Sequence, residues 1–267
     1  MSHSSSPTTS SVQASTNIPL SSLSIVIPVL NEIECIRRAL TTIADFGRES
    51  GLDIELIIVN DGSTDGVETV VESFDDDAIE VRLINNDVNQ GKGFSVRRGM
   101  MATTRDAALM SDADLSTPID NVLKLAERLS DADVVIGSRN VSDSVISREQ
   151  PWHRRFTGNL LRWLRGCLIL RDLSDTQCGF KLFKRDVAHR AFELQTVRGF
   201  TFDIEVLAIA RMLGYKIAEV GVTWRDHDDS RVRAVRDGIR MTLSLIKIWW
   251  RWAVCKTSRQ QEIDNQP

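Results

Sequence analysis

The sequence predicts an α/β protein built on a mostly parallel β-sheet with helices on both faces. Short apolar segments rich in β-branched residues alternate at least four times with segments of helical spacing, and this alternation is typical of parallel sheets. Polar residues directly follow several of these apolar segments, which is where ligands bind in open α/β sheets. The 267 residues are 42% hydrophobic, which is enough for one large core.

The apolar segments are expected as strands because each is a short, continuous run of the kind that a sheet buries on both faces. They are "LSIVIPVL" at 23–30, "IELIIVN", "IEVRLINND", "AALMSDADLSTP", which ends in acids, and "ADVVIGSR". The segments between them repeat apolar residues at helical spacing and are expected as helices. They are "NEIECIRRALTTIADFGRES", which ends near Gly51, "VETVVESF", "GKGFSVRRGMMATT" and "DNVLKLAERLS".

Three parts are predicted along the chain. Residues 1–22 are rich in serine and threonine and lack the basic start and apolar centre of a signal peptide, so we expect a disordered leader. Residues 23–234 are expected to form the α/β domain, and residues 235–267 an amphipathic C-terminal helix and tail. No run of about 18 uncharged apolar residues is present, so no membrane-spanning segment is predicted.

Composition excludes several classes of protein. The net charge of −4 at pH 7 argues against a nucleic-acid-binding protein, which is usually basic. The charge is uneven, because six arginines and one acid fall between Arg148 and Arg171. The cysteines lie far apart without a CxxC pair, which indicates reduced thiols rather than a zinc site or disulfides. They are Cys35, Cys167, Cys178 and Cys255.

Two carboxylates, Asp112 and Asp114, stand two residues apart at the end of a predicted strand. Carboxylates aimed at one point attract a divalent cation such as Mg²⁺ or Mn²⁺, and this cation can neutralise a diphosphate and help it to leave. The alternative is a solvated turn in which an aspartate caps the next helix. The D-x-D pattern alone does not decide between these two interpretations.

Asp61 and Lys92 are candidates for nucleotide binding. Asp61 follows a strand, where a carboxylate can accept a hydrogen bond from a base or a ribose hydroxyl; the alternative is an Asx turn. Lys92 stands between two glycines near a helix start, where backbone amides and a cation suit a phosphate. The P-loop spacing and the G-x-G-x-x-G pattern are both missing, so neither a P-loop nor a dinucleotide site is predicted.

The order of these motifs resembles glycosyltransferase family 2, whose members have the GT-A fold. Along the chain come "PVLNE", "NDGSTDG", the lysine between glycines, "DADLS" and "GSR". Further on, "DTQCGFKLF" at 175–183 and "FDIEVL" at 202–207 resemble the branch that acts on polyprenyl phosphates, which includes dolichyl-phosphate β-glucosyltransferases and bacterial undecaprenyl-phosphate enzymes. The resemblance covers about residues 23 to 234, and "DTQCGFK" is its most specific part.

The resemblance implies a hexosyltransferase that uses a nucleotide sugar, with UDP-glucose expected ahead of GDP-mannose. Within the donor site, Asp112 and Asp114 would hold Mg²⁺ or Mn²⁺ as the cofactor, and Asp175 and Gln177 would bond sugar hydroxyls. The full set of residues implied to bind the nucleotide sugar is Pro28, Glu32, Asp61, Lys92, Asp112, Asp114, Asp175 and Gln177.

The turn "SDTQCGFK" would close the site beneath the donor sugar. Gly179 would allow a tight turn and Lys181 would add a cation, whereas Cys178 and Phe180 are expected to pack in the interior. The alternative is a polar loop that ties the preceding segment to the sheet.

The implied acceptor is a polyprenyl phosphate, attacked in line so that an α-linked donor gives a β-linked product. Arg139, Arg154 and Arg231 would grip the acceptor phosphate, since a guanidinium fork suits a phosphate; the sequence does not separate Arg154 from Arg155. Asp203 stands at the family's general-base position. Because the second pKa of a phosphate monoester is about 6, the acceptor is already largely ionised, so Asp203 either takes a proton or only orients a substrate.

A polyprenyl phosphate lies in a bilayer, so the resemblance also implies a membrane surface as a partner. Two basic amphipathic segments with tryptophans, at 153–170 and 236–256, suit contact with a membrane; packing on the core or in a dimer interface is the alternative. We therefore expect a cytoplasmic protein, peripheral on the cytoplasmic face of a membrane, with a membrane-anchoring partner or a second copy of the chain as a further partner.

Two other functions fit part of this pattern. The first is a GT-A transferase that uses GDP-mannose or acts on a soluble or glycolipid acceptor, and "DTQCGFK" with the arginine-rich segment favours the lipid phosphate over it. The second is a catalytically silent protein that binds a nucleotide sugar. The carboxylates at Asp61, Asp112, Asp114 and Asp203 argue against this second alternative.

Overall fold

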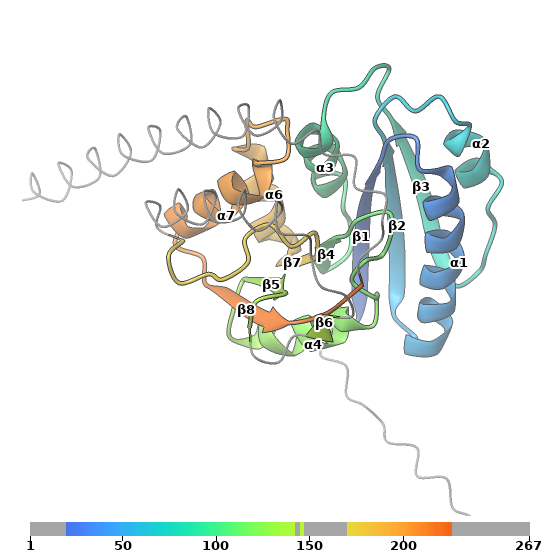
Figure 1. Cartoon of the computed structure of the whole chain (residues 1–267). Helices are drawn as coiled ribbons and strands as arrows, with labels where there is room; N and C mark the ends of the chain where they lie inside the picture. The colour runs from blue at the N-terminus through green and yellow to red at the C-terminus, as the bar shows by residue number, and fades with distance from the viewer. Residues whose placement is uncertain (1–19, 142–144, 147–169, 226–267) are drawn as a thin grey trace, which may run out of the picture.

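The computed structural model describes residues 20–141, 145–146 and 170–225 (Figure 1). Most of the predicted leader, most of the arginine-rich segment and the chain from residue 226 onward lie outside the described residues. The expectations for Arg154, for Arg231 and for the amphipathic character of the two basic segments therefore stay predictions.

A seven-stranded sheet forms the centre of the molecule, in the order β3-β2-β1-β4-β7-β5-β8. Neighbouring strands are parallel except at β7, which is antiparallel to both β4 and β5. A small parallel sheet joins β6 (Val145–Ile146) to β9 (Thr223–Trp224). The mostly parallel sheet predicted from the sequence is thus confirmed. The strands of the large sheet are β1 (Ser22–Val29), β2 (Asp53–Asn60), β3 (Ile79–Asn85), β4 (Ala107–Met110), β5 (Val134–Ser138), β7 (Lys181–Lys184) and β8 (Ile217–Gly221).

Helices cover both faces of this sheet, as predicted (Figure 1). One face carries α1, α2 and α4, and the other carries α3, α6 and α7, each set sharing a separate hydrophobic cluster with the strands. The described helices are α1 (Ile33–Ser50), α2 (Val67–Glu72), α3 (Lys92–Met101), α4 (Asn121–Glu127), α6 (Arg185–Glu193) and α7 (Phe202–Met212), with a 3-10 turn at Arg128–Ser130.

Strands β1, β2, β4 and β5 are buried on both faces, as their continuous apolar sequences require. In β1, Ile25 and Ile27 belong to the cluster shared with α1, α2 and α4, whereas Val26 belongs to the opposite cluster. Successive side chains of a strand point to opposite faces, so one strand supplies both layers of the core.

The antiparallel strand β7 places an extra segment at the site edge of the sheet. Its first residue, Lys181, pairs with Met110 of β4 and with Ile136 of β5. An antiparallel strand begins where its parallel neighbours end, so residues 174–180 enter the sheet at the carboxyl ends of the other strands. The sequence did not predict β7, and this strand brings the "SDTQCGFK" turn to the same edge as Asp112.

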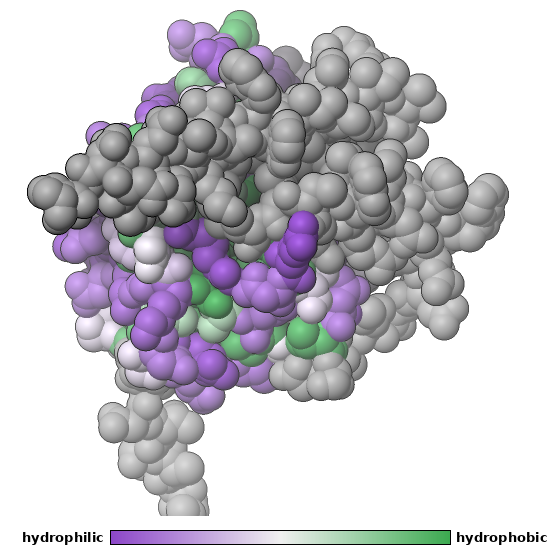
Figure 2. Space-filling model, turned by 90° about the vertical axis from the view of Figure 1, so that its left-hand side faces the viewer, coloured by the Kyte–Doolittle hydropathy of each residue, from purple (hydrophilic) through white to green (hydrophobic). Residues whose placement is uncertain are grey.

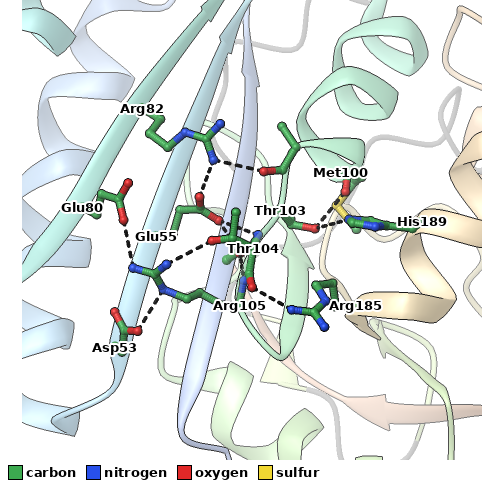
Figure 3. A network of polar contacts seen from close by, with 12 residues as sticks. Asp53, Glu55, Glu80, Arg82, Met100, Thr103, Thr104, Arg105, Arg185 and His189 are labelled. Atoms are coloured by element: carbon green, nitrogen blue, oxygen red, sulfur yellow. Dashed lines mark hydrogen bonds and ion pairs between the residues drawn. The ribbon is translucent and has the colours of Figure 1, made fainter.

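A buried carboxylate lies near the start of β2, toward the opposite edge of the sheet (Figure 3). Glu55 is fully buried. It accepts hydrogen bonds from Ser24 Oγ at 2.5 Å, from Arg82 Nη1 at 2.5 Å and from the Thr104 amide at 3.0 Å. Burial alone would raise the pKa of Glu55, but its bonds to Ser24, Arg82 and Thr104 hold that pKa below its ordinary value.

We expect Glu55→Gln to lower the free energy of unfolding by about 1–3 kcal/mol at pH 7, because a neutral amide leaves buried donors poorly satisfied. Folding lowers the pKa of Glu55 from its ordinary value of 4.5. The stabilisation is therefore present above that pH and is lost as the pH falls below it. In urea unfolding followed by circular dichroism, the difference between wild type and variant should shrink between pH 7 and about pH 3.

The matched control for this prediction is Glu80→Gln. Glu80 pairs with Arg105 at 2.9 Å, but its side chain is 52% exposed, and exposed ion pairs contribute at most about 1 kcal/mol. A Glu55→Gln effect that stayed constant from neutral to acidic pH would contradict the role given to the ionised carboxylate.

On the side of α7 and β8, the surface that the described residues show is mostly hydrophilic, with its hydrophobic residues in small groups (Figure 2). Within the described part of the chain, no helix has both the length and the apolar character needed to span a bilayer.

Candidate active site

Polar residues from four separate segments meet at the carboxyl edge of the sheet. β4 leads into Asp112 and Asp114, the start of α3 supplies Lys92, and the start of β7 supplies Lys181. The first turn of α7 adds Asp203. The structure therefore brings together residues that are far apart in the sequence.

The ion pair between Lys92 and Asp112 lies at the centre of this site. Lys92 Nζ is 2.5 Å from Asp112 Oδ1, and the two side chains are 26% and 37% exposed. Burial alone would lower the pKa of the Lys92 ammonium, but Asp112, Asp203 and Asp114 together hold it above its ordinary value. Lys92 is therefore a fixed positive charge within reach of solvent.

The Asp112 carboxylate also lies directly against the backbone of Gly179. A Cβ atom built on Gly179 would lie 2.0 Å from Asp112 Oδ2 and 2.5 Å from its Cγ, distances at which no side chain fits. Sequence reasoning assigned this glycine to a tight turn, but the structure gives a second reason for it. Any larger residue would displace the carboxylate.

Asp114 follows in the same turn and is half-buried. Its Oδ1 accepts a hydrogen bond from the Ser116 amide at 2.9 Å, and the Ser116 carbonyl accepts one from the Arg225 amide at 2.9 Å. Burial, with Glu32 and Asp114 as further causes, raises the pKa of the Cys35 thiol. Glu32, at the N-terminus of α1, therefore lies close enough to this turn for both carboxylates to act on one thiol.

The donor set at Asp112 and Asp114 suits a hard divalent cation. Both side chains offer carboxylate oxygens, and Mg²⁺ is usually held by one or two carboxylates together with substrate phosphates. Among the described residues, no group of three or more metal-binding side chains gathers at one point. These residues therefore fit a cation that completes its coordination with substrate oxygens.

Asp61 holds the loop before α3. It is 4% exposed, and its carboxylate accepts hydrogen bonds from Asn86 Nδ2 at 2.8 Å, from the Gln90 amide at 2.8 Å and from the Gly91 amide at 2.9 Å. The Asp61 carboxylate is therefore bonded to groups of the protein itself. The structure thus shows Asp61 shaping the turn that presents Lys92, while its predicted contact with a nucleoside stays a prediction.

Asn31 ties the loop after β2 to the end of β1, a role that sequence reasoning missed. Asn31 has a positive φ of 52°, and asparagine tolerates this conformation better than most residues. Its amide donates to Ser63 Oγ at 2.9 Å, and its side-chain oxygen accepts from the Thr64 amide at 2.7 Å. The signal in the sequence was an asparagine directly after a strand.

Lys181 and Asp203 form a second ion pair, which is buried. Lys181 Nζ is 2.5 Å from Asp203 Oδ1, and the side chains are only 2% and 8% exposed. The same ammonium donates to the Cys178 carbonyl at 2.5 Å. Burial raises the pKa of the Asp203 carboxyl above its ordinary value, although Lys181 and Lys92 oppose this shift. The cation predicted at Lys181 is thus bound to the residue predicted as the base.

Arg139 and Asp175, which the resemblance assigned to different substrates, bind each other. Arg139 Nε donates to Asp175 Oδ2 at 2.7 Å and Nη2 to Oδ1 at 2.9 Å. Burial alone would raise the pKa of Asp175, but Arg139 holds it below its ordinary value. Arg139 also lies 5.5 Å from the ring centre of Trp224. Any contact of either residue with a substrate would have to coexist with this pair or break it.

Two buried or half-buried glutamates position the loops of the site, and sequence reasoning gave neither of them this role. Glu219 of β8 accepts from the amides of Ser174 and Asp175, each at 2.8 Å. Glu205, on the first turn of α7, accepts from the amides of Thr196 and Val197 at 2.9 Å and 2.7 Å. A lone glutamate in a strand or helix carries no sequence signal for such loop contacts.

The remaining predicted residues lie at the same edge or outside the described residues. Pro28 is buried in β1. The pairing of β1 with β4 ends at Val26, so the N–H group that proline lacks costs no hydrogen bond to β4. Gln177 is half-buried in the turn before β7. As expected, Cys178 and Phe180 pack in the core, and burial raises the pKa of Cys178 to about 11.

Comparison with curated proteins finds relatives that match most of the chain. A dolichyl-phosphate beta-glucosyltransferase of Trichomonas vaginalis is 32% identical over 237 residues, which are 85% of this chain and 72% of that protein. The Saccharomyces cerevisiae protein of the same name is 32% identical and covers 85% of this chain and 73% of its own length. The Homo sapiens protein is 29% identical, with 88% and 76% covered.

Solved structures share the fold. A glucosyl-3-phosphoglycerate synthase from Mycobacterium tuberculosis, crystallised with Mn²⁺, UDP and glucosyl-3-phosphoglycerate, is 22% identical with a TM-score of 0.64, covering 84% of this chain and 78% of that chain. Another mycobacterial protein gives a TM-score of 0.65 at 22% identity, covering 86% of this chain and 74% of that chain. This likeness confirms the GT-A fold.

A family model also matches the part of the chain that builds the site. The glycosyl transferase family 2 model matches residues 24–192, from β1 to the end of α6, and this range contains Asp61, Lys92 and the two carboxylates after β4. Together with relatives at about 30% identity over most of its length, this match shows that the chain belongs to glycosyl transferase family 2.

Proposed function

We propose that this chain transfers glucose from UDP-glucose to a polyprenyl phosphate of the dolichyl or undecaprenyl type, giving a β-linked polyprenyl-phosphate sugar. One observation carries the proposal. Curated proteins 28–32% identical over 84–88% of this chain are named dolichyl-phosphate beta-glucosyltransferases. The geometry of the carboxyl edge supplies the charges that such a transfer needs.

The reaction is a displacement at the anomeric carbon. An oxygen of the acceptor phosphate attacks that carbon from the face opposite the diphosphate, and a new carbon–oxygen bond forms. The bond from the anomeric carbon to the diphosphate breaks, and the nucleoside diphosphate leaves with the electron pair. Because the acceptor phosphate is largely a dianion near pH 7, its second pKa being about 6, no proton has to be removed first.

Negative charge grows on the leaving diphosphate, and the structure offers cationic groups to meet it. Lys92 stands at the N-terminus of α3, where backbone N–H groups and an ammonium both favour a phosphate. A divalent cation held by Asp112 and Asp114 would neutralise the diphosphate further. Fixed charges of this kind supply the larger part of the rate enhancement in many enzymes.

Asp203 is proposed to orient the acceptor or the sugar rather than to remove a proton. Its Oδ1 is bound to Lys181, and its side chain is 8% exposed. A buried, ion-paired carboxylate has a fixed direction, which suits an orienting role. Asp175 and Gln177, in the turn before β7, remain the proposed contacts to sugar hydroxyls.

The acceptor side of the proposal rests on the arginines and on the lipid nature of the acceptor. Arg139 lies at the end of β5, whereas Arg154 and Arg231 lie outside the described residues. We propose that the protein works as a peripheral protein on the cytoplasmic face of a membrane, because its acceptor is anchored there. The basic segments around residues 148–171 and 236–251 are the proposed contacts with anionic lipid.

The experiment presents four donors separately to the purified full chain with Mn²⁺ or Mg²⁺ and a short polyprenyl phosphate in detergent. The donors are UDP-glucose, UDP-galactose, UDP-N-acetylglucosamine and GDP-mannose. We expect labelled lipid from UDP-glucose with matching release of UDP, and no labelled lipid in Asp114→Ala. Asp77→Ala, in an exposed loop between α2 and β3, is the matched control and should keep its activity.

Each outcome of this experiment decides one part of the proposal. Labelled lipid from GDP-mannose alone would keep the lipid acceptor and overturn the glucose assignment. Nucleotide release to water or to a soluble acceptor, without labelled lipid, would overturn the lipid acceptor. Nucleotide binding without transfer from any donor would overturn the proposed transfer and support a catalytically silent protein that binds a nucleotide sugar.

A further inference from the structure

The ammonium of Lys92 and a divalent cation would use the same oxygen. Lys92 Nζ lies 2.5 Å from Asp112 Oδ1. The other oxygen of Asp112 faces the backbone at Gly179, where a Cβ atom would be only 2.0 Å away. The ammonium therefore binds one Asp112 oxygen that a cation would use, while the other oxygen lies against the Gly179 backbone.

The positive charges around this contact weaken the attraction of the carboxylates for a divalent cation. Three carboxylates, on Asp112, Asp114 and Asp203, act on Lys92, and Lys181 is bound to Asp203. Three negative and two positive charges leave this group with a net charge of −1. Without the Lys92 charge the same group would carry −2, which is a stronger site for a divalent cation.

We propose that Lys92 competes with the divalent cation for Asp112, and that a nucleoside diphosphate relieves this competition by giving the ammonium a phosphate partner. Lys92 then makes the binding of cation and of diphosphate cooperative. Cooperativity of this kind is reciprocal, so each of the two ligands raises the affinity for the other by the same factor. The inference rests on the proposed function, because that function supplies the diphosphate.

The backbone around Lys92 allows this exchange to take place in the side chain alone. A Cβ atom on Gly91 would lie 2.6 Å from the Arg198 carbonyl oxygen, and one on Gly93 would lie 2.6 Å from that of Val197. The Gly93 carbonyl also accepts a hydrogen bond from Gln195 Nε2 at 2.9 Å. These contacts hold the main chain on both sides of Lys92, while its flexible four-carbon stem can turn from one anion to another.

The test measures binding of Mn²⁺ alone, by the electron paramagnetic resonance signal of the free ion, to the full chain without donor or lipid. We expect Lys92→Met to bind Mn²⁺ at least fivefold more tightly than the wild type. Lys92→Arg, which keeps the charge, should stay close to the wild type. Lys124→Met, on the exposed side of α4, is the matched control and should not change the affinity.

A second titration measures the coupling. UDP should raise the Mn²⁺ affinity of the wild type by a larger factor than it raises the Mn²⁺ affinity of Lys92→Met. The Mn²⁺–UDP complex that forms in solution is calibrated separately. Circular dichroism checks that each variant is folded. An Mn²⁺ affinity of folded Lys92→Met equal to or below that of the wild type would overturn the inference.

The two proposals fail separately. If the wild type glucosylates a polyprenyl phosphate and Lys92→Met leaves the Mn²⁺ affinity unchanged, only the inference about Lys92 is wrong. If Lys92→Met tightens Mn²⁺ binding and no donor labels the lipid, the competition stands and the proposed acceptor is wrong.

Discussion

Replacing Lys181 with methionine is expected to lower the free energy of unfolding by about 3–5 kcal/mol, because it leaves the Asp203 carboxylate buried without its partner. Both side chains of this pair are almost fully buried, at 2% and 8% exposure. The change also removes the hydrogen bond to the Cys178 carbonyl. Urea unfolding followed by circular dichroism measures the loss.

The loss of transfer should exceed what lower stability explains. Burial raises the pKa of Asp203 and Lys181 opposes that shift, so removing Lys181 lets the pKa rise further. The carboxyl is then ionised only at higher pH, and the pH profile of the remaining activity should move upward. A purely structural role for Lys181 predicts lower activity with an unchanged pH profile.

Two comparisons make this prediction falsifiable. Lys184→Met, in the same strand, breaks a pair with Asp133 whose side chains are 44% and 27% exposed, and exposed pairs contribute at most about 1 kcal/mol. The double variant Lys181→Met with Asp203→Leu replaces the buried pair by apolar groups, which is often neutral or stabilising. The double variant should regain stability without regaining transfer activity. Transfer activity in the double variant would contradict the role given to the Lys181–Asp203 pair in the reaction.

The larger part of the fold could be predicted from the sequence because four of its strands, β1, β2, β4 and β5, are buried on both faces. Continuous apolar runs such as "LSIVIPVL" have no other easy place in a folded chain. The fourth strand was predicted to extend through "SDADLSTP", but it ends at Met110, because the polar residues that follow belong to the turn of the site. Strand β7 was missed because its four residues, "KLFK", begin and end with lysine and show no apolar run.

The site could be predicted as a set of residues, but not as a set of pairs. A polar residue at the end of a buried strand is visible in the sequence, which is why Asp61 and Asp112 were identified. A lysine between two glycines at a helix start is visible too, which is why Lys92 was identified. Arg139 and Asp175 are 36 residues apart, and Lys181 and Asp203 are 22 residues apart. Spacing along the chain does not say which opposite charges meet, since that depends on the direction of β7 and on the packing of α7 against the sheet.

Gly179→Ala is expected to lower kcat/KM for transfer at least 100-fold while it costs about 1 kcal/mol or less of stability. The added methyl group would lie 2.0, 2.5 and 2.8 Å from Oδ2, Cγ and Oδ1 of Asp112, so the whole carboxylate has to move. A side-chain end can move at little cost in folding energy, but a displacement of about 1 Å in a catalytic group can cost about 10²-fold in rate. Activity and stability should therefore separate in this variant.

Gly199→Ala is the matched control for this substitution. A Cβ atom there has no neighbour within 4 Å, so both activity and stability should stay close to the wild type. The cause is tested by a double-mutant cycle with Asp112→Ala. If Gly179→Ala acts by displacing the Asp112 carboxylate, it should cause no further loss once that carboxylate is gone. Additive losses would instead mean that the turn before β7 acts on the reaction through another residue.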